Sequence, residues 1–141
     1  MPSSIKVGII GFGVVGGGTY EALTKNAASI TRRAGLPVEV ARVADVDWSR
    51  EREVTVPEAL RTTDTMAMIH DPELHIIVET IGGLSPALDF VRAALSAGKS
   101  VVTSNKELIA KHGHELLALA AEKGVDLQFE GSVGGVVPII R

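Results

Sequence analysis

The chain has 141 residues, 45% of them hydrophobic and 22% charged, with a formal net charge of −3 at pH 7; this is typical of one globular domain with a substantial core. It has no cysteine, which excludes disulfides and thiolate chemistry, and its acidic balance without a basic stripe argues against a nucleic-acid partner. No apolar run is long enough for a membrane span and no signal peptide is evident, so we expect a cytoplasmic protein.

The N-terminal stretch has the pattern of a strand, a glycine turn and a helix. An apolar strand at residues 5–10 leads into Gly11, Gly13 and Gly16, which have the G-x-G-x-x-G spacing of a dinucleotide site. The first glycine allows the sharp turn, the second lets a pyrophosphate approach the backbone, and the third lets the helix pack closely on the strand. The free N–H groups at the start of the helix would then bind the phosphates. The alternative is an ordinary glycine turn.

Hydrophobic strands and helices alternate along the rest of the chain. This predicts a Rossmann-type doubly wound α/β fold, with a mainly parallel sheet and helices on both faces. Val15, Ala22 and Leu23 of the first helix are expected to face the sheet. Further strands are expected at 38–44, 75–80, 100–103 and 125–130, with a charged loop at 48–57 that contains a weak strand at 54–56. The expected helices are 14 to 26 or beyond, 64–70, a segment between Pro86 and Gly98, and 104–123 with an interruption at Gly113.

Ligands of such sheets bind at the carboxyl ends of the strands. The segments that follow the expected strands are small, polar or charged, unlike the strands themselves. They are residues 11–13, 45–47, 81–83, 103–106 and 130–132. We therefore expect these five segments to form the site.

Asp45 or Asp47 is placed to accept the hydroxyl groups of an adenosine ribose, which would favour NAD. Asp45 follows Gly16 by 29 residues, whereas the usual interval is about 20; we attribute the excess to a lengthened connection through residues 29–37. Each aspartate has an equally good alternative as a turn or cap residue. Arg50 or Arg52 is also in reach of a 2′-phosphate, so the choice between NAD and NADP stays open.

Two charged residues follow later strands. Lys106 lies at an expected helix start, where a cation opposes the helix dipole, so the charge is best explained by an anionic substrate or cofactor, with a plain surface lysine as the alternative. Glu130 is followed by a glycine-rich loop whose carbonyl groups, together with the carboxylate, suit a hard cation. On the residues alone, a carboxylate that caps N–H groups is the better interpretation of Glu130.

Four stretches together resemble homoserine dehydrogenase, in its N-terminal nucleotide-binding domain. The resemblance covers essentially the whole chain, and its last two stretches are specific. It implies NAD(P)-dependent interconversion of L-homoserine and L-aspartate 4-semialdehyde by hydride transfer, in the aspartate pathway to threonine and methionine. The stretches are VGIIGFGVVG at 7–16, IIVETIGG at 76–83, VVTSNK at 101–106 and FEGSVGGVVPIIR at 129–141.

The resemblance also assigns site residues. These residues add to the glycines and Asp45 as cofactor-binding residues. The resemblance places Phe12, Val14 and Val15 at the turn that contacts the cofactor, and Ile81 and Ser104 near the nicotinamide. It implies that Lys106 is the catalytic residue, at the junction of cofactor and substrate. It implies a sodium site formed by Glu130, Val133, Gly135 and Val137. Val46 departs from the family, since many relatives carry an arginine there that suits NADP.

The family enzymes continue into a catalytic and dimerisation domain. We therefore expect residues 1–141 to be the NAD(P)-binding domain, with that second domain following residue 141 and absent from this chain. This domain alone should bind nucleotide without turnover, and the complete enzyme should be a homodimer that binds the small-molecule substrate. The alternatives are a domain of another NAD(P)-dependent oxidoreductase, of the aspartate dehydrogenase or dihydrodipicolinate reductase type, or a non-catalytic nucleotide-binding module.

Overall fold

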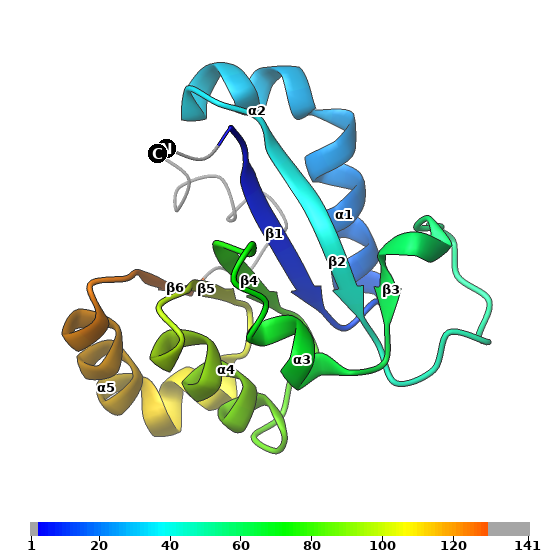
Figure 1. Cartoon of the computed structure of the whole chain (residues 1–141). Coiled ribbons are helices and arrows are strands. Elements are labelled where there is room, and N and C mark those ends of the chain that lie inside the picture. The colour runs from blue at the N-terminus through cyan, green and yellow to red at the C-terminus, as the bar shows by residue number, and fades with distance from the viewer. Residues whose placement is uncertain (1–2, 130–141) are drawn as a thin grey trace.

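The computed structural model describes residues 3–129, which form a parallel sheet flanked by helices (Figure 1). Its strand order is β3-β2-β1-β4-β5-β6, and every pair of neighbours is parallel. The direction of strand addition reverses between β1 and β4, which is where the fold binds ligands. The strands are β1 (Ile5–Ile10), β2 (Val38–Ala44), β3 (Arg61–Thr62), β4 (Ile76–Glu79), β5 (Ser100–Thr103) and β6 (Leu127–Phe129).

The helices cover both faces of the sheet, which confirms the doubly wound fold. Leu23 and Ile30 pack with Val7 and Ile9 of β1 in one core, whereas Ile10 packs on the other side of the sheet. This division follows from the two-residue period of a strand. The helices of the first core are α1 (Val14–Lys25) and α2 (Ala27–Ala34); α3 (Thr65–Ile69), α4 (Ala87–Ser96) and α5 (Lys106–Lys123) pack on the second core, and a short 3₁₀ helix, η1, spans Glu58–Leu60.

The first helix differs from the prediction at two points. Leu23 is buried as expected, but the side chain of Val15 is 42% exposed, because the buried face of α1 is set by Gly16, one residue further along. The helix ends at Lys25, and the separate helix α2 follows after Asn26. This second helix accounts for the long interval between the glycine turn and Asp45.

Two other predictions are wrong. Gly113 does not interrupt α5, which is continuous and buries this glycine. Residues 54–56 form no strand, because Val56 turns into the core with 1% exposure instead of pairing. The strand beside β2 is the two-residue β3, which pairs Arg61 with Val43.

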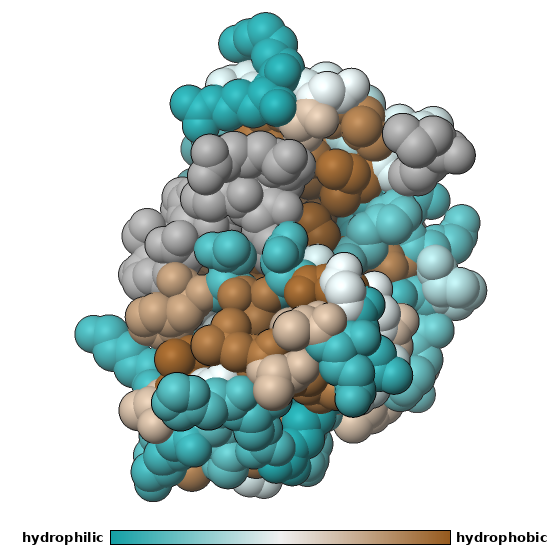
Figure 2. Space-filling view, turned by 90° about the vertical axis from the view of Figure 1, so that its left-hand side faces the viewer, coloured by the Kyte–Doolittle hydropathy of each residue, from teal (hydrophilic) through white to brown (hydrophobic). Residues whose placement is uncertain are grey.

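The surface is not evenly polar. On the face shown in Figure 2, hydrophobic residues gather in a central area, with hydrophilic residues above and below it. The edge strand on this side is β6, whose Phe129 is 39% exposed. Within residues 3–129, no helix is both long enough and apolar enough to cross a membrane.

Candidate functional site

The glycine turn after β1 has the geometry that its spacing predicts. Gly11 has a φ of +93°, and a Cβ there would lie 2.7 Å from Ile81 Cγ2. A Cβ on Gly16 would lie 2.0 Å from the carbonyl oxygen of Gly11. A Cβ on Gly13 would meet no described atom within 4 Å. The first and third glycines are therefore required by the fold, whereas the second leaves open space for a ligand.

The N-terminus of α1 is left uncapped by side chains. Its N-cap is Gly13, and the first bond of the helix runs from the Gly17 N–H to the Gly13 carbonyl. The N–H groups of Val14, Val15 and Gly16 precede that bond and have no acceptor within the helix. In α5, by contrast, the cap side chain is bonded to the backbone. An anion is therefore better accommodated at the start of α1 than at the start of α5.

Phe12 supports the turn, with its ring packed in the core. Its ring is 1% exposed and lies 5.9 Å from the ring of Tyr20 and 5.6 Å from that of Trp48, centroid to centroid. Its N–H is donated to Asp45, and its carbonyl accepts from Arg52. Any direct role of Phe12 in ligand binding would have to come from this backbone, since the side chain belongs to the core.

The carboxylate of Asp45, at the end of β2, is nearly enclosed, with 8% of the side chain exposed. Its Oδ1 accepts the Val46 N–H at 2.7 Å. Its Oδ2 accepts the Arg52 guanidinium at 2.7 Å, the Phe12 N–H at 3.3 Å and the Arg50 guanidinium at 3.4 Å. Burial raises the pKa of Asp45, but the hydrogen bonds and the Arg52 charge outweigh it and hold the pKa below its ordinary value of 3.8.

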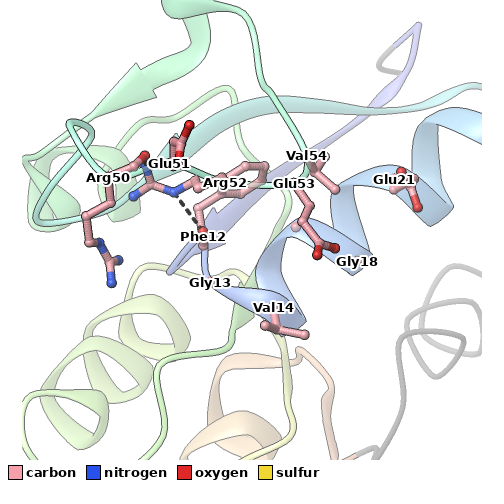
Figure 3. A pocket seen from close by; sticks show the side chains of 11 residues that line it. Phe12, Gly13, Val14, Gly18, Glu21, Arg50, Glu51, Arg52, Glu53 and Val54 are labelled. Carbon is pink, nitrogen blue, oxygen red and sulfur yellow. Dashed lines mark hydrogen bonds between the residues drawn. The ribbon is translucent and has the colours of Figure 1, made fainter.

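Arg52 ties the loop after β2 to the glycine turn. Its Nε donates to the Phe12 carbonyl at 2.9 Å (Figure 3), and its guanidinium also donates to the carbonyl of Asp47. The guanidinium carbon lies 4.8 Å from the centroid of the Trp48 ring. Asp47 itself is turned to Ser49, whose N–H and hydroxyl it accepts. The turn interpretation is thus correct for Asp47.

A cavity of about 460 Å³ lies between this loop and α1 (Figure 3). Arg50 extends from the loop past the glycine turn, Glu53 points toward Gly18 of α1, and Glu51 points away from Arg50. The lining residues are Phe12, Gly13, Val14, Gly17, Gly18, Glu21, Arg50, Glu51, Arg52, Glu53 and Val54. The cavity therefore borders the uncapped helix start on one side and an exposed arginine on the other.

A buried hydrogen-bond network joins the loops after β4 and β5. Glu79 is fully buried and accepts the Thr103 hydroxyl at 2.6 Å and the N–H groups of Ile81 and Gly82 at 2.8 and 3.0 Å. Asn105 donates its N–H to the Thr103 hydroxyl oxygen at 3.0 Å. These bonds fix the two loops relative to each other.

The same edge carries the other predicted residues. Thr80 donates its hydroxyl to the carbonyls of Ile10 and Gly11, so the loop after β4 contacts the glycine turn. Asn105 donates its side-chain amide to the Gly83 carbonyl and caps α5 through the Leu108 N–H. Lys106 follows as the first residue of α5, exposed to solvent, with Ser104 half-buried beside it.

The structure thus brings together Gly11 to Gly16, Asp45, Ile81, Ser104 and Lys106 at the carboxyl ends of β1, β2, β4 and β5. The predicted cation ligands Glu130, Val133, Gly135 and Val137 lie outside the described residues. Among residues 3–129 there is no group of three histidine or acidic side chains suited to a metal.

Sequence reasoning missed the supporting residues. Thr103 and Asn105 lie in a segment that is expected at the site but have no individual role there, and Glu79 has no predicted role, although its place in the strand gives a signal. It is the one charged residue of an otherwise apolar buried strand, and a buried carboxylate requires hydrogen-bond donors. Two of its donors, the N–H groups of Ile81 and Gly82, follow it directly along the chain, but Thr103 comes from β5 and could not be identified from spacing.

Comparisons with known proteins agree on one family. The family model "Homoserine dehydrogenase, NAD binding domain" matches residues 11–130. The homoserine dehydrogenase of Pseudomonas aeruginosa is 44% identical over 137 residues, 97% of this chain and 31% of that protein. That of Bacillus subtilis is 38% identical over 138 residues, 98% of this chain and 32% of that protein.

Solved structures show the same relation. The crystal structure of a homoserine dehydrogenase from Thiobacillus denitrificans matches 90% of this chain and 29% of its own, with a TM-score of 0.81 and 45% identity. A hyperthermophilic archaeal homoserine dehydrogenase mutant, solved in complex with NADPH, shares the fold with a TM-score of 0.72 at 23% identity. The chain spans about a third of the length of the curated relatives that it matches.

Proposed function

We propose, since this chain belongs to the homoserine dehydrogenase family as its NAD-binding domain, that it binds NAD or NADP along the carboxyl edge of its sheet. The diphosphate would lie over Gly13 and accept the free N–H groups at the start of α1. The adenosine would extend toward Asp45, and the nicotinamide toward Ile81, Ser104 and Lys106.

One observation carries this proposal. The glycine turn, the loop after β4 and the start of α5 are connected by hydrogen bonds from Thr80 and Asn105. They meet where the strand order reverses, between β1 and β4. A ligand that spans from the open space over Gly13 to Lys106 would therefore contact three strand ends that are already held in place.

In the complete enzyme, the bound coenzyme would exchange a hydride with the carbon that bears the homoserine hydroxyl, giving aspartate semialdehyde. Lys106 is the residue of this domain that we propose to contact the substrate; its exposed ammonium group suits a carboxylate or carbonyl oxygen. The catalytic and dimerisation domain that we propose beyond residue 141 would supply the proton acceptor and the contacts of a homodimer. A sodium site at Glu130, Val133, Gly135 and Val137 stays a prediction from family resemblance.

Coenzyme binding can be measured on this chain through Trp48, its single tryptophan, by energy transfer to the reduced nicotinamide of NADH or NADPH. The decisive variant is Gly13→Ala. The new methyl group meets no described atom, so the fold should be kept, but it would occupy the approach of the diphosphate. We expect affinity for both coenzymes to fall about tenfold or more, since one displaced charged hydrogen bond is worth about 1.5–3 kcal/mol.

Gly113→Ala is the matched control, because it makes the same change in the middle of α5, away from the turn. This variant should bind like the wild type. Saturable binding that Gly13→Ala leaves unchanged would contradict the placement of the diphosphate, and absence of binding by the wild type would contradict the function itself.

A further inference from the structure

The carboxylate of Asp45 is already surrounded by donors. Its Oδ2 accepts from Arg52, Phe12 and Arg50, which is one donor more than its two lone pairs, and its Oδ1 accepts from Val46. With 8% of the side chain exposed, a 2′-hydroxyl could bind Oδ2 only if one of these donors left. The sequence-based assignment of Asp45 as a free ribose acceptor therefore conflicts with the side-chain contacts observed.

Arg50 is the donor that can leave. Its contact is the longest of the four, at 3.4 Å, and its side chain is 59% exposed. The side chain of Arg52, by comparison, is 13% exposed and is held by the Phe12 carbonyl. The remaining two donors are backbone N–H groups fixed by the turn and by the strand end. Only Arg50 can exchange its partner without disturbing the turn.

On the basis of the proposed function, we propose that Arg50 selects the coenzyme, and that the domain binds the 2′-phosphorylated dinucleotide, NADP(H), more tightly than NAD(H). The 2′-phosphate takes the Arg50 guanidinium away from Asp45, while Arg52 stays paired with the carboxylate. An arginine makes strong, often bidentate hydrogen bonds to phosphate, so this exchange gains charge pairing. A neutral 2′-hydroxyl that displaced Arg50 would leave the guanidinium without an anionic partner.

The local charges favour this exchange. Two guanidinium groups, of Arg50 and Arg52, face the carboxylate of Asp45. The carboxylate of Asp47 is near both charges but is hydrogen-bonded to Ser49, so Arg50 has only its long contact to Asp45 to give up. The cavity also has acidic residues, but Glu51 points away from Arg50 and Glu53 points toward Gly18 (Figure 3). Val46, the residue after Asp45, is uncharged and 87% exposed, so the cations beside the proposed ribose position are Arg50 and Arg52.

The test compares dissociation constants for NADPH and NADH, by energy transfer from Trp48, in the wild type, Arg50→Gln and Arg50→Lys. Arg50→Gln should weaken NADPH binding about tenfold or more and leave NADH unchanged or slightly tighter, because the hydroxyl then reaches Asp45. Arg50→Lys should keep part of the preference, since it keeps the charge but loses the planar fork. Adenosine 2′,5′-bisphosphate should compete better than ADP in the wild type alone.

Arg92→Gln is the matched control, because Arg92 is an exposed arginine paired with Glu115 between α4 and α5; its two dissociation constants should be those of the wild type. Equal affinity of the wild type for NADH and NADPH, or an equal loss for both in Arg50→Gln, would overturn the role of Arg50 while leaving the proposed function intact. Failure of both coenzymes to bind the wild type would overturn the proposed function, and this role with it.

Discussion

Asp45 and Arg52 show how a single ion pair can organise a loop. The pair is nearly enclosed, with side-chain exposures of 8% and 13%, so both charges have lost most of their hydration. Arg52 offsets this by also bonding the Phe12 carbonyl and lying over the Trp48 ring. The pair joins the end of β2 to the glycine turn, and its loss would leave one charge buried without a partner.

The pKa of Asp45 is lowered in the folded state, so its contribution to stability is fully present above pH 3.8, the ordinary value, and is lost as pH falls through the lowered pKa. We expect Asp45→Asn to lower the free energy of unfolding by about 3 kcal/mol at pH 7. This difference should shrink at the most acidic pH at which both proteins still fold, because protonated aspartic acid resembles asparagine.

Urea unfolding of both proteins across this pH range measures the difference. Asp126→Asn, a change at an exposed position, is the control and should alter stability little at either end of the range. A difference between wild type and Asp45→Asn that stays constant down to acid pH would contradict the linkage to this ion pair.

At the scale of elements, α1 and α5 differ in how their first turns are satisfied. Gly13 offers no side chain at the start of α1, whereas Asn105 accepts the Leu108 N–H at the start of α5. The first arrangement leaves N–H groups for a ligand, and the second makes α5 stable without one. Lys106 is therefore presented at a fixed position by a helix whose start is already satisfied.

Gly113 lies within continuous α5, where a glycine is less favourable than alanine by about 0.5–1 kcal/mol. A Cβ there would meet only the Cγ2 atom of Ile109, at 3.4 Å. We therefore expect Gly113→Ala to raise the free energy of unfolding by about that amount, measured by urea unfolding. A destabilised variant would show that this glycine is needed for packing.

At the scale of the whole molecule, the candidate site exists because the sheet is parallel and its strand order reverses beside β1. Glu79 links the loops after β4 and β5, and Thr80 links the loop after β4 to the glycine turn. The proposed positions of the diphosphate, at Gly13, and of the nicotinamide, near Lys106, are thus coupled through these hydrogen bonds.

The proposed role of Lys106 can be tested in a longer protein that contains this domain and the catalytic domain. Lys106→Ala should lower kcat/KM for homoserine about tenfold or more, because it removes a charged contact to the substrate, while coenzyme affinity changes less. Lys111→Ala, at an exposed lysine five residues further along α5, is the control. Unchanged kinetics in Lys106→Ala would remove this lysine from the mechanism.

The sequence by itself determined most secondary-structure elements and the edge of the sheet at which the candidate site lies. The strands at 5–10, 38–44 and 100–103 were predicted with the observed bounds, because a continuous apolar run between turn residues leaves few alternatives. Glycine spacing likewise predicted the turn, since backbone contacts of the kind made by Gly16 depend on local geometry alone.

Only the tertiary structure decided which polar groups are free. Asp45 and Phe12 look available in sequence, but the carboxylate of Asp45 is nearly enclosed and the ring of Phe12 is buried. Their partners Arg52 and Trp48 come from a loop that has no regular pattern. Glu79 likewise accepts the hydroxyl of Thr103 from the neighbouring strand β5. Hydrogen-bond partners that are distant along the chain follow no periodic sequence pattern, so their pairing is set by packing in three dimensions.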